Sequence, residues 1–159
     1  MKVVERKKRV EYEERLVSEW AAKTHPEARV HFRVRVGELP EEAATLSAEG
    51  ISPYMYGVVR HWADAVVIYP DRVLVVEGKL KLSSMALGQI IVNTELLGST
   101  PEFRDRWDTP REGLLLFAYG DPETEKTAVA MGYKTERFCP AWAKKAYVER
   151  MRKGQVRVR

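Results

Sequence analysis

The sequence predicts a single α/β domain with a central mixed β-sheet flanked by helices. Three observations indicate this fold class: residues 62–80 have the pattern of a β-hairpin, residues 114–119 form the continuous apolar run of a strand buried on both faces, and helical patterns precede and follow them. The chain has 159 residues. This is the length of one ordinary domain with a substantial core, so we assign residues 1–159 to one unit.

The predicted elements follow in the order helix, strand, hairpin, helix, strand, helix, short strand and helix. We expect helices at residues 5–22, 83–97, 122–131 and 141–153, and strands at residues 31–36, 62–69, 72–80, 114–119 and 133–138. Ser83 and Gly98 are expected to cap the second helix. Residues 40–48 suit a short helix, and residues 51–57 read as a loop. Alternation in the first strand predicts one face with Phe32, Val34 and Val36 and the other with His31, Arg33 and Arg35.

The hairpin at residues 62–80 carries the most informative side chains. Pro70 and Asp71 form its tip, because proline fixes φ and aspartate makes local hydrogen bonds in turns. A four-residue loop is favoured over a two-residue loop, since proline cannot take the positive φ that the commonest two-residue turns require. Both loops give the same cross-strand pairs, which are Ile68 with Val73, Val66 with Val75, and Asp64 with Glu77.

The predicted register places Asp64 opposite Glu77, with Lys79 one pleat further along the same face. Like charges that face each other across two strands repel, so a positive group is expected between them. A divalent cation with oxygen ligands meets this need, and Lys79 supplies a second positive group. The alternative is that both carboxylates are solvated at the open end of the hairpin. The apolar residues Val73 and Val75 on the same face favour a buried site.

The hairpin resembles the signature of the PD-(D/E)XK nuclease superfamily in four residues, Asp64, Glu77, Gly78 and Lys79, with twelve residues between the first two. Arg60, which precedes the first strand of the hairpin, adds to the likeness. The resemblance follows the element order over residues 5–150 and is specific over residues 57–93. It implies a restriction-endonuclease-like fold with an αβββαβ core. Gly78 departs from the family pattern, in which an apolar or β-branched residue is common, and glycine loosens a strand.

The resemblance also implies roles for individual residues. Asp64 and Glu77 would bind Mg²⁺ or Mn²⁺, the backbone of Gly78 would add a ligand, and Lys79 would orient the attacking water. On the helix after the lysine strand, Gln89 is the expected catalytic polar residue and Asn93 an accessory one; the alternative is a satisfied polar stripe on a buried helix.

The resemblance further implies that a glutamate of the first helix reaches the site. Glu13 is the candidate, because it falls inside the apolar stripe of that helix, where a carboxylate is costly. The neighbouring Glu11 and Glu14 are equally plausible. For Arg60 two roles stay open, contact with the scissile phosphate or pairing with a carboxylate.

The sequence therefore predicts a Mg²⁺- or Mn²⁺-dependent endonuclease that hydrolyses DNA phosphodiester bonds, with RNA not excluded. Tyr54, Tyr56 and Lys81 are the candidate nucleic-acid contacts, although aromatic rings often pack within their own loop. Without a separate recognition module, we expect structure-guided cutting, cutting by a homodimer, or delivery by a partner protein. A second hypothesis is a catalytically inactive nuclease-like fold that serves as a nucleic-acid-binding or phage assembly subunit; the complete Asp, Glu and Lys set argues against it.

Charge is unevenly distributed along the chain. Residues 1–9 carry five Lys or Arg and one Glu, and residues 144–159 carry seven Lys or Arg and one Glu. These basic ends, +4 and +6, flank a middle of net charge −6 within a total of +4. They suit a protein that holds a phosphate backbone at its margins and a metal at its centre, and solvated helix ends are the alternative.

The remaining composition bears on localisation. No apolar run approaches the roughly 20 residues of a membrane span, and the basic amino end lacks the apolar stretch of a signal peptide. We therefore expect a cytoplasmic protein, phage-encoded in a bacterial host if the resemblance extends that far. Cys139 is the single cysteine, so no internal disulfide forms. Few Asn, Gln and Cys beside many Arg and Glu are typical of proteins from hot environments.

Overall fold

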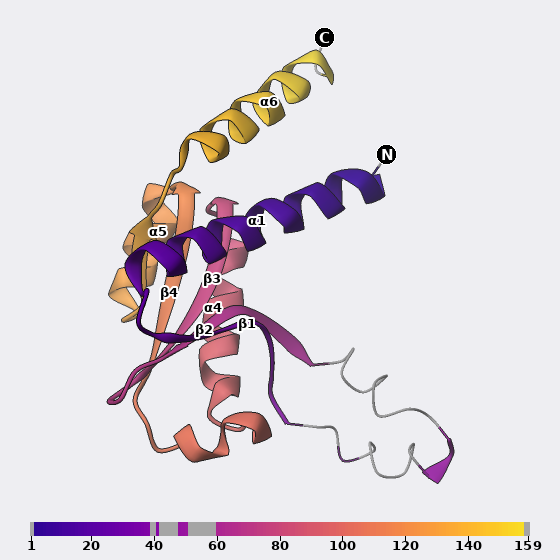
Figure 1. Ribbon diagram of the computed structural model, residues 1–159. Coiled ribbons are helices and arrows are strands. Elements are labelled where there is room, and N and C mark those ends of the chain that lie inside the picture. The colour runs from indigo at the N-terminus through magenta and orange to yellow at the C-terminus, as the bar shows by residue number, and fades with distance from the viewer. Residues whose placement is uncertain (1, 39–40, 42–47, 51–59, 158–159) are drawn as a thin grey trace.

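The computed structural model describes residues 2–38, 41, 48–50 and 60–157, and it is a single α/β domain (Figure 1). The helices are α1 (Lys2–Thr24), α4 (Ser84–Leu97), the 3₁₀ segment η2 (Pro101–Arg106), α5 (Pro122–Ala130) and α6 (Ala141–Arg157). The strands are β1 (Arg29–Val36), β2 (His61–Ile68), β3 (Val73–Lys81), β4 (Arg111–Tyr119) and β5 (Lys134–Arg137). The predicted fold class is confirmed.

The five strands form one mixed sheet in the order β1-β2-β3-β4-β5. The pairs β1–β2 and β2–β3 are antiparallel, whereas β3–β4 and β4–β5 are parallel. The apolar run in β4 is buried along most of its length because β4 lies inside the sheet with helices over both faces. β1 and β5 lie at the two edges of this sheet.

Two hydrophobic layers cover the sheet. On one face α1 packs through Leu16, Val17 and Trp20, and α6 joins it through two alanines, Ala143 and Ala146. On the opposite face α4 and α5 pack against the other side chains of β2, β3 and β4. α4 is apolar around most of its circumference, so its sequence pattern does not show which side faces the sheet.

The hairpin has the predicted register. Ile68 pairs with Val73 and Val66 with Val75, and the two strands are joined by the four residues 69–72. The loop is closed by a hydrogen bond of 2.9 Å from the Tyr69 N–H to the carbonyl of Arg72. The tip at Pro70 and Asp71 is therefore confirmed.

Several boundaries and local details differ from the predictions. α1 and α6 are both longer than expected, because charged residues with good helix propensity extend them beyond their apolar stripes. Ser83 lies at the start of α4 without a side-chain capping bond, and Gly98 has right-handed helical φ and ψ. The expected helix at 40–48 and loop at 51–57 fall mostly outside the described residues. In the described part of the chain, no helix is long and apolar enough to cross a lipid bilayer.

The alternation predicted for β1 is wrong in part. Phe32 is 49% exposed, whereas Val36 on the same predicted face is fully buried. The cause lies between them, at Arg33, whose φ of 52° is outside the range of a strand. This local irregularity changes which side chains of β1 reach the core.

Gly78 is explained by the close approach of α1 to β3. A Cβ atom at this position would overlap Cγ2 of Val17 and would lie 3.6 Å from the carbonyl oxygen of Glu13. An apolar or β-branched residue at position 78 would therefore push α1 away from the sheet. The packing of α1 against β3 therefore accounts for a glycine at position 78.

We expect Gly78→Ala to lower the free energy of unfolding by about 1–3 kcal/mol, the usual cost of overpacking a core. The measurement is urea denaturation of the variant beside the wild type. Val17→Ala removes the atom that the new methyl group meets, so the double variant should lose less stability than the sum of the two single changes.

Gly88→Ala is the matched control. Gly88 lies in α4 with no atom within 4 Å of an added Cβ, so the same change should raise stability by about 0.5–1 kcal/mol. A Gly78→Ala variant as stable as the wild type would show that α1 can shift without cost.

Candidate active site

The adjacent strands β2 and β3 bring Asp64 and Glu77 together. The backbone pairing of these strands reaches Ala65 and Val76, which are the neighbours of the two acids. The Gly78 N–H donates a hydrogen bond of 2.8 Å to Oδ2 of Asp64. The carboxylate of Asp64 therefore lies against β3 directly beside Glu77.

Glu77 is a buried carboxylate, only 2% exposed. Its Oε1 accepts a hydrogen bond of 2.7 Å from Nζ of Lys79, and its Oε2 lies 3.4 Å from Nδ2 of Asn93. A buried carboxylate is costly unless it is paired, and Lys79 provides the pairing charge.

The first helix contributes Glu13 to this cluster. Oε2 of Glu13 lies 3.7 Å from Nζ of Lys79, and both side chains are largely buried. Of the neighbouring glutamates, Glu11 is exposed and Glu14 forms an ion pair of 2.5 Å with Arg33. Among the three candidates on α1, Glu13 is the one that the structure places at the lysine.

The cluster formed by Glu13, Asp64, Glu77 and Lys79 holds three carboxylates and one ammonium group. Burial and then repulsion by Asp64 raise the pKa of Glu77 to about 7, despite the neighbouring ammonium. Burial also raises the pKa of Asp64. Burial disfavours the charged form of Lys79, but the carboxylates, Glu77 first, outweigh it and raise the pKa of Lys79. The ammonium thus stays charged at neutral pH, and the cluster has an excess of negative charge.

This donor set fits a hard divalent cation. The available ligands are carboxylate oxygens, which Mg²⁺ and Mn²⁺ prefer, and the raised pKa of Glu77 shows that further positive charge would be favourable there. Within the described residues, no three His, Cys, Asp or Glu side chains already form a metal-binding group. Mg²⁺ commonly keeps several waters and uses one or two carboxylates, the number that Asp64 and Glu77 offer.

On α4, Asn93 rather than Gln89 lies at the cluster. Asn93 is 2% exposed and its amide donates to the carbonyl of Trp62 at 2.8 Å, in addition to its approach to Glu77. Gln89, one turn earlier, is exposed, and in the described part of the chain it makes no hydrogen bond to the cluster. The buried amide of Asn93 thus links the start of β2 to the catalytic candidate Glu77.

Arg60 pairs with a carboxylate outside the cluster. Its guanidinium donates two hydrogen bonds, of 2.7 and 2.8 Å, to Glu102 in η2, and a third of 3.2 Å to the carbonyl of Arg35. The hydrogen bonds from Arg60 lower the pKa of Glu102. In this arrangement Arg60 joins β1, β2 and η2, which is the second of the two roles left open by the sequence.

The predicted nucleic-acid contacts are described only in part. Lys81 is exposed at the end of β3 and its ammonium donates to the carbonyl of Gly120. Tyr54 and Tyr56 lie outside the described residues.

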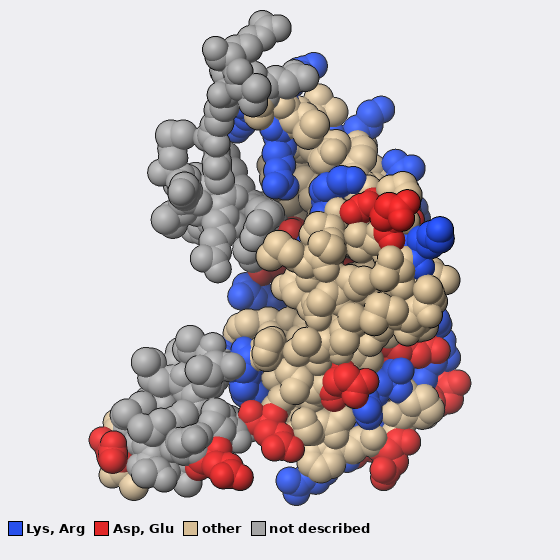
Figure 2. Space-filling view, turned by 180° about the vertical axis from the view of Figure 1, so that it is seen from behind, with Lys and Arg blue, Asp and Glu red and all other residues tan. Residues whose placement is uncertain are grey.

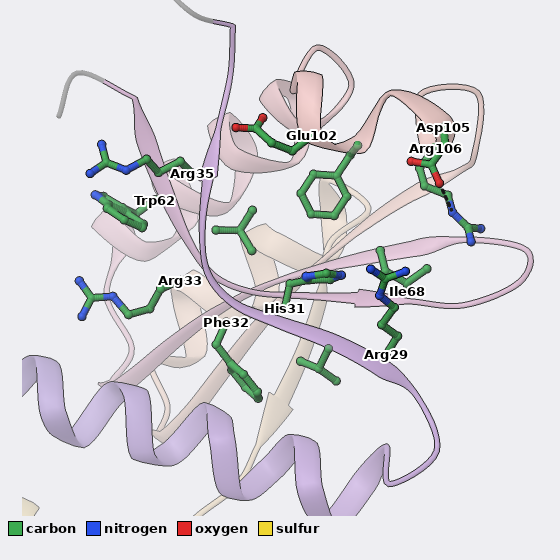
Figure 3. Close-up of a pocket in the computed structure, with 13 residues that line it drawn as sticks. Arg29, His31, Phe32, Arg33, Arg35, Trp62, Ile68, Glu102, Asp105 and Arg106 are labelled. Carbon is green, nitrogen blue, oxygen red and sulfur yellow. Dashed lines mark ion pairs between the residues drawn. The ribbon is translucent and has the colours of Figure 1, made fainter. Parts of the chain in front are cut away.

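A pair of arginines beside an exposed tryptophan was not predicted. Guanidinium groups of Arg33 and Arg35 lie 5.4 and 4.2 Å from the ring centroid of Trp62 (Figure 3). Trp62 is two residues before Asp64, and the only signal in the sequence was the alternation of the two arginines along β1. Their contact with Trp62 depends on the pairing of β1 with β2, in which Arg35 lies opposite Trp62.

Comparison of the chain with family models, with curated proteins and with solved structures gives no match.

The raised pKa of Glu77 predicts a pH-dependent stability. Between pH 4.5 and about 7 the folded protein holds a proton on Glu77 that the unfolded chain has released, so stability falls as the pH rises through this window. In EDTA, the free energy of unfolding of the wild type should fall by up to about 3 kcal/mol relative to that of Glu77→Gln across this range. The measurement is chemical denaturation at several pH values.

Glu102→Gln is the control for this experiment. The pKa of Glu102 is lowered, so its stabilising contribution disappears only as the pH falls below 4.5. Its profile between pH 4.5 and 7 should keep the shape of the wild type. If the free energy of unfolding of the wild type and of Glu77→Gln changed with pH in the same way, the raised pKa of Glu77 would be contradicted.

Proposed function

We propose that this protein is a Mg²⁺- or Mn²⁺-dependent nuclease that hydrolyses phosphodiester bonds, with DNA as its principal substrate. The observation that carries the proposal is the buried cluster, in which two carboxylates of adjacent strands, a lysine and a helix glutamate converge. A fold that needed only stability would not bury three acids around one ammonium, because such a group costs free energy. The resemblance of the hairpin to the PD-(D/E)XK signature supports the same chemistry.

In this proposal Asp64 and Glu77 hold the cation. The bound cation would supply Lewis acidity at a phosphate oxygen and lower the pKa of a bound water. Lys79 remains an ammonium at neutral pH, so it orients the water and stabilises the negative charge that develops on the phosphate; it does not act as a base. Glu13 and Glu77 hold its Nζ from two sides and thereby fix its position.

The basic ends of the chain support a nucleic-acid substrate. The second half of α6 projects beyond the end of the sheet at which β3 and β4 terminate, and the first half of α1 extends sideways from the sheet near the same end (Figure 1). Glu77 and Lys79 lie near this end of β3. Figure 2 shows Lys and Arg side chains gathered around α6, whereas the broad surface over α4 has few charges. This distribution suits a phosphate backbone bound beside the cluster.

Purified protein should cut plasmid, branched or single-stranded DNA in Mn²⁺ or Mg²⁺ but not in EDTA, measured by gel electrophoresis. Lys79→Ala and Asp64→Asn should each lower the cleavage rate by at least about 100-fold, the usual scale for removing one electrostatic catalytic group.

Binding of the ion can be measured separately from cleavage. Mn²⁺ should raise the melting temperature of the wild type but not of Asp64→Asn. The increase should be larger at pH 8 than at pH 5.5, because protons compete with the ion for Glu77.

Lys134→Ala is the matched control, since Lys134 also lies on a strand and pairs with a glutamate at 2.7 Å, but at the far edge of the sheet. It should cut at the rate of the wild type. Cleavage that survives Lys79→Ala would assign the activity to another site or to a contaminant. Ion binding without cleavage of DNA or RNA would favour the non-catalytic alternative.

The role of α6 in binding can be tested by its salt dependence. Replacing Arg150, Arg152 and Lys153 by Gln should weaken DNA binding and reduce the slope of log affinity against log salt by roughly 0.7–0.9 for each phosphate that the variant no longer neutralises. All three residues are exposed. The measurement is a titration of labelled DNA in EDTA at several salt concentrations.

A control variant with the same change in net charge is Lys23→Gln, Lys126→Gln and Lys134→Gln, which are exposed positions on other surfaces. Its salt slope should stay close to that of the wild type. Equal slopes for the two triple variants would show that overall charge, and not α6, attracts the DNA.

A further inference from the structure

A groove of about 810 Å³ runs along the outer edge of the sheet, between β1 and η2 (Figure 3). Four arginines contribute to its lining, Arg29, Arg33, Arg35 and Arg106. Its two acidic side chains already have basic partners, since Glu102 binds Arg60 and Asp105 lies 3.6 Å from Arg106. The groove therefore presents an excess of positive charge to a ligand.

Trp62 forms one wall of this groove and is 42% exposed. Its ring lies between Arg33 and Arg35 in Figure 3, with the closer guanidinium, that of Arg35, 4.2 Å from the ring centroid. An exposed indole costs free energy in water. An aromatic ring beside two guanidinium groups is typical of protein surfaces that stack nucleobases and bind phosphates.

Trp62 is also adjacent to the acidic cluster. It precedes Asp64 by two residues on β2, a distance of roughly 7 Å along a strand. The carbonyl of Trp62 accepts the hydrogen bond from Asn93, whose amide also approaches Glu77. A nucleotide held on Trp62 would therefore lie next to the phosphate presented to Asp64 and Glu77.

The backbone at Arg33 strengthens this assignment. A φ of 52° is costly for a residue with a Cβ, and such strain tends to persist where a side chain must point in a particular direction. Here it accompanies the placement of the guanidinium between Glu14 of α1 and the ring of Trp62.

We propose that Trp62, Arg33 and Arg35 form a stacking subsite for an unpaired nucleobase, and that the substrate of the site is single-stranded or locally unpaired nucleic acid. This inference rests on the proposed nuclease function and specifies its substrate class. A base within a duplex is already stacked on both faces, so it cannot lie on a side chain without leaving the helix. A peptide added to the edge strand would use the backbone of β1 and would not require the indole.

The spacing of the three side chains indicates where the base enters. A base inserted between the guanidinium of Arg33 and the indole of Trp62 would stack on both, which requires roughly 7–8 Å between those two groups. In the structure the guanidinium of Arg33 lies 5.4 Å from the centroid of the indole ring. Arg33 would move outward by roughly 2 Å as the base enters and would then pair with the phosphate of that nucleotide. Its present partner Glu14 is partly exposed, so exchanging that ion pair costs little.

The test measures binding in EDTA, separately from cleavage. The probes are a fluorescein-labelled oligothymidylate and a blunt duplex, each about 15 nucleotides long, followed by anisotropy. Trp62→Ala should weaken single-strand binding roughly 5- to 100-fold and duplex binding by less than about 2-fold, whereas Trp62→Phe should retain most of the affinity. An oligonucleotide containing 2-aminopurine should lose fluorescence on binding the wild type and much less on binding Trp62→Ala.

Arg35→Ala is compared with Arg104→Ala, which removes an arginine 5.4 Å from the ring of Trp107 and outside the lining of the groove. Only Arg35→Ala should weaken single-strand binding. The inference would be overturned by any of three results. Trp62→Ala could lose equal affinity for the single strand and the duplex, it could lose affinity for neither, or the wild type could fail to bind single strands. If cleavage does not depend on Trp62, the subsite is refuted and the nuclease proposal stands. If single-strand binding depends on Trp62 but no metal-dependent cleavage occurs, the subsite stands and the nuclease proposal is refuted.

Discussion

The contact between α1 and β3 at Gly78 is the constraint on which the candidate site depends. Because position 78 has no side chain, Val17 packs directly against the backbone of β3. This approach carries Glu13, one helical turn earlier, to Lys79, while the N–H of Gly78 binds Asp64. The backbone at position 78 thus contacts both the helix that carries Glu13 and the carboxylate of Asp64. The absence of a side chain at position 78 is what lets α1 approach β3 this closely.

The chemistry follows from the charge imbalance that this packing creates. Three carboxylates share one ammonium in a place from which water is largely excluded, and the raised pKa of Glu77 reflects the free energy that this costs. A protein retains such a cost where it serves function, because stability alone would favour apolar side chains. The same carboxylates raise the pKa of Lys79, and in the function that we propose they favour a divalent cation at the cluster.

The sequence predicted those features that depend on local pattern, and it was silent about those that depend on helix rotation or on distant partners. The hairpin register followed from strand alternation and the Pro70 tip. The choice between Gln89 and Asn93 did not, because α4 is apolar nearly all round and either amide could face the sheet. The partner of Arg60 is 42 residues away in η2, and no periodicity indicates such a pair. The contacts of Arg33 and Arg35 with Trp62 could not be predicted either, because they also join residues that are far apart in the sequence.

In the function that we propose, the placement of Trp62 and Asp64 on one strand would link recognition to catalysis. Both side chains are carried by β2, in which Trp62 pairs with Arg35 of β1 and the Asp64 carboxylate accepts a hydrogen bond from Gly78 of β3. A base bound by the indole and a phosphate bound at the carboxylates would therefore keep a fixed separation, without a loop having to close over the substrate. A single strand can bend to satisfy both contacts at once, whereas a regular duplex would have to open first. If the proposed subsite binds a base, the order of these two residues along β2 would favour ends, loops and branch points over continuous duplex.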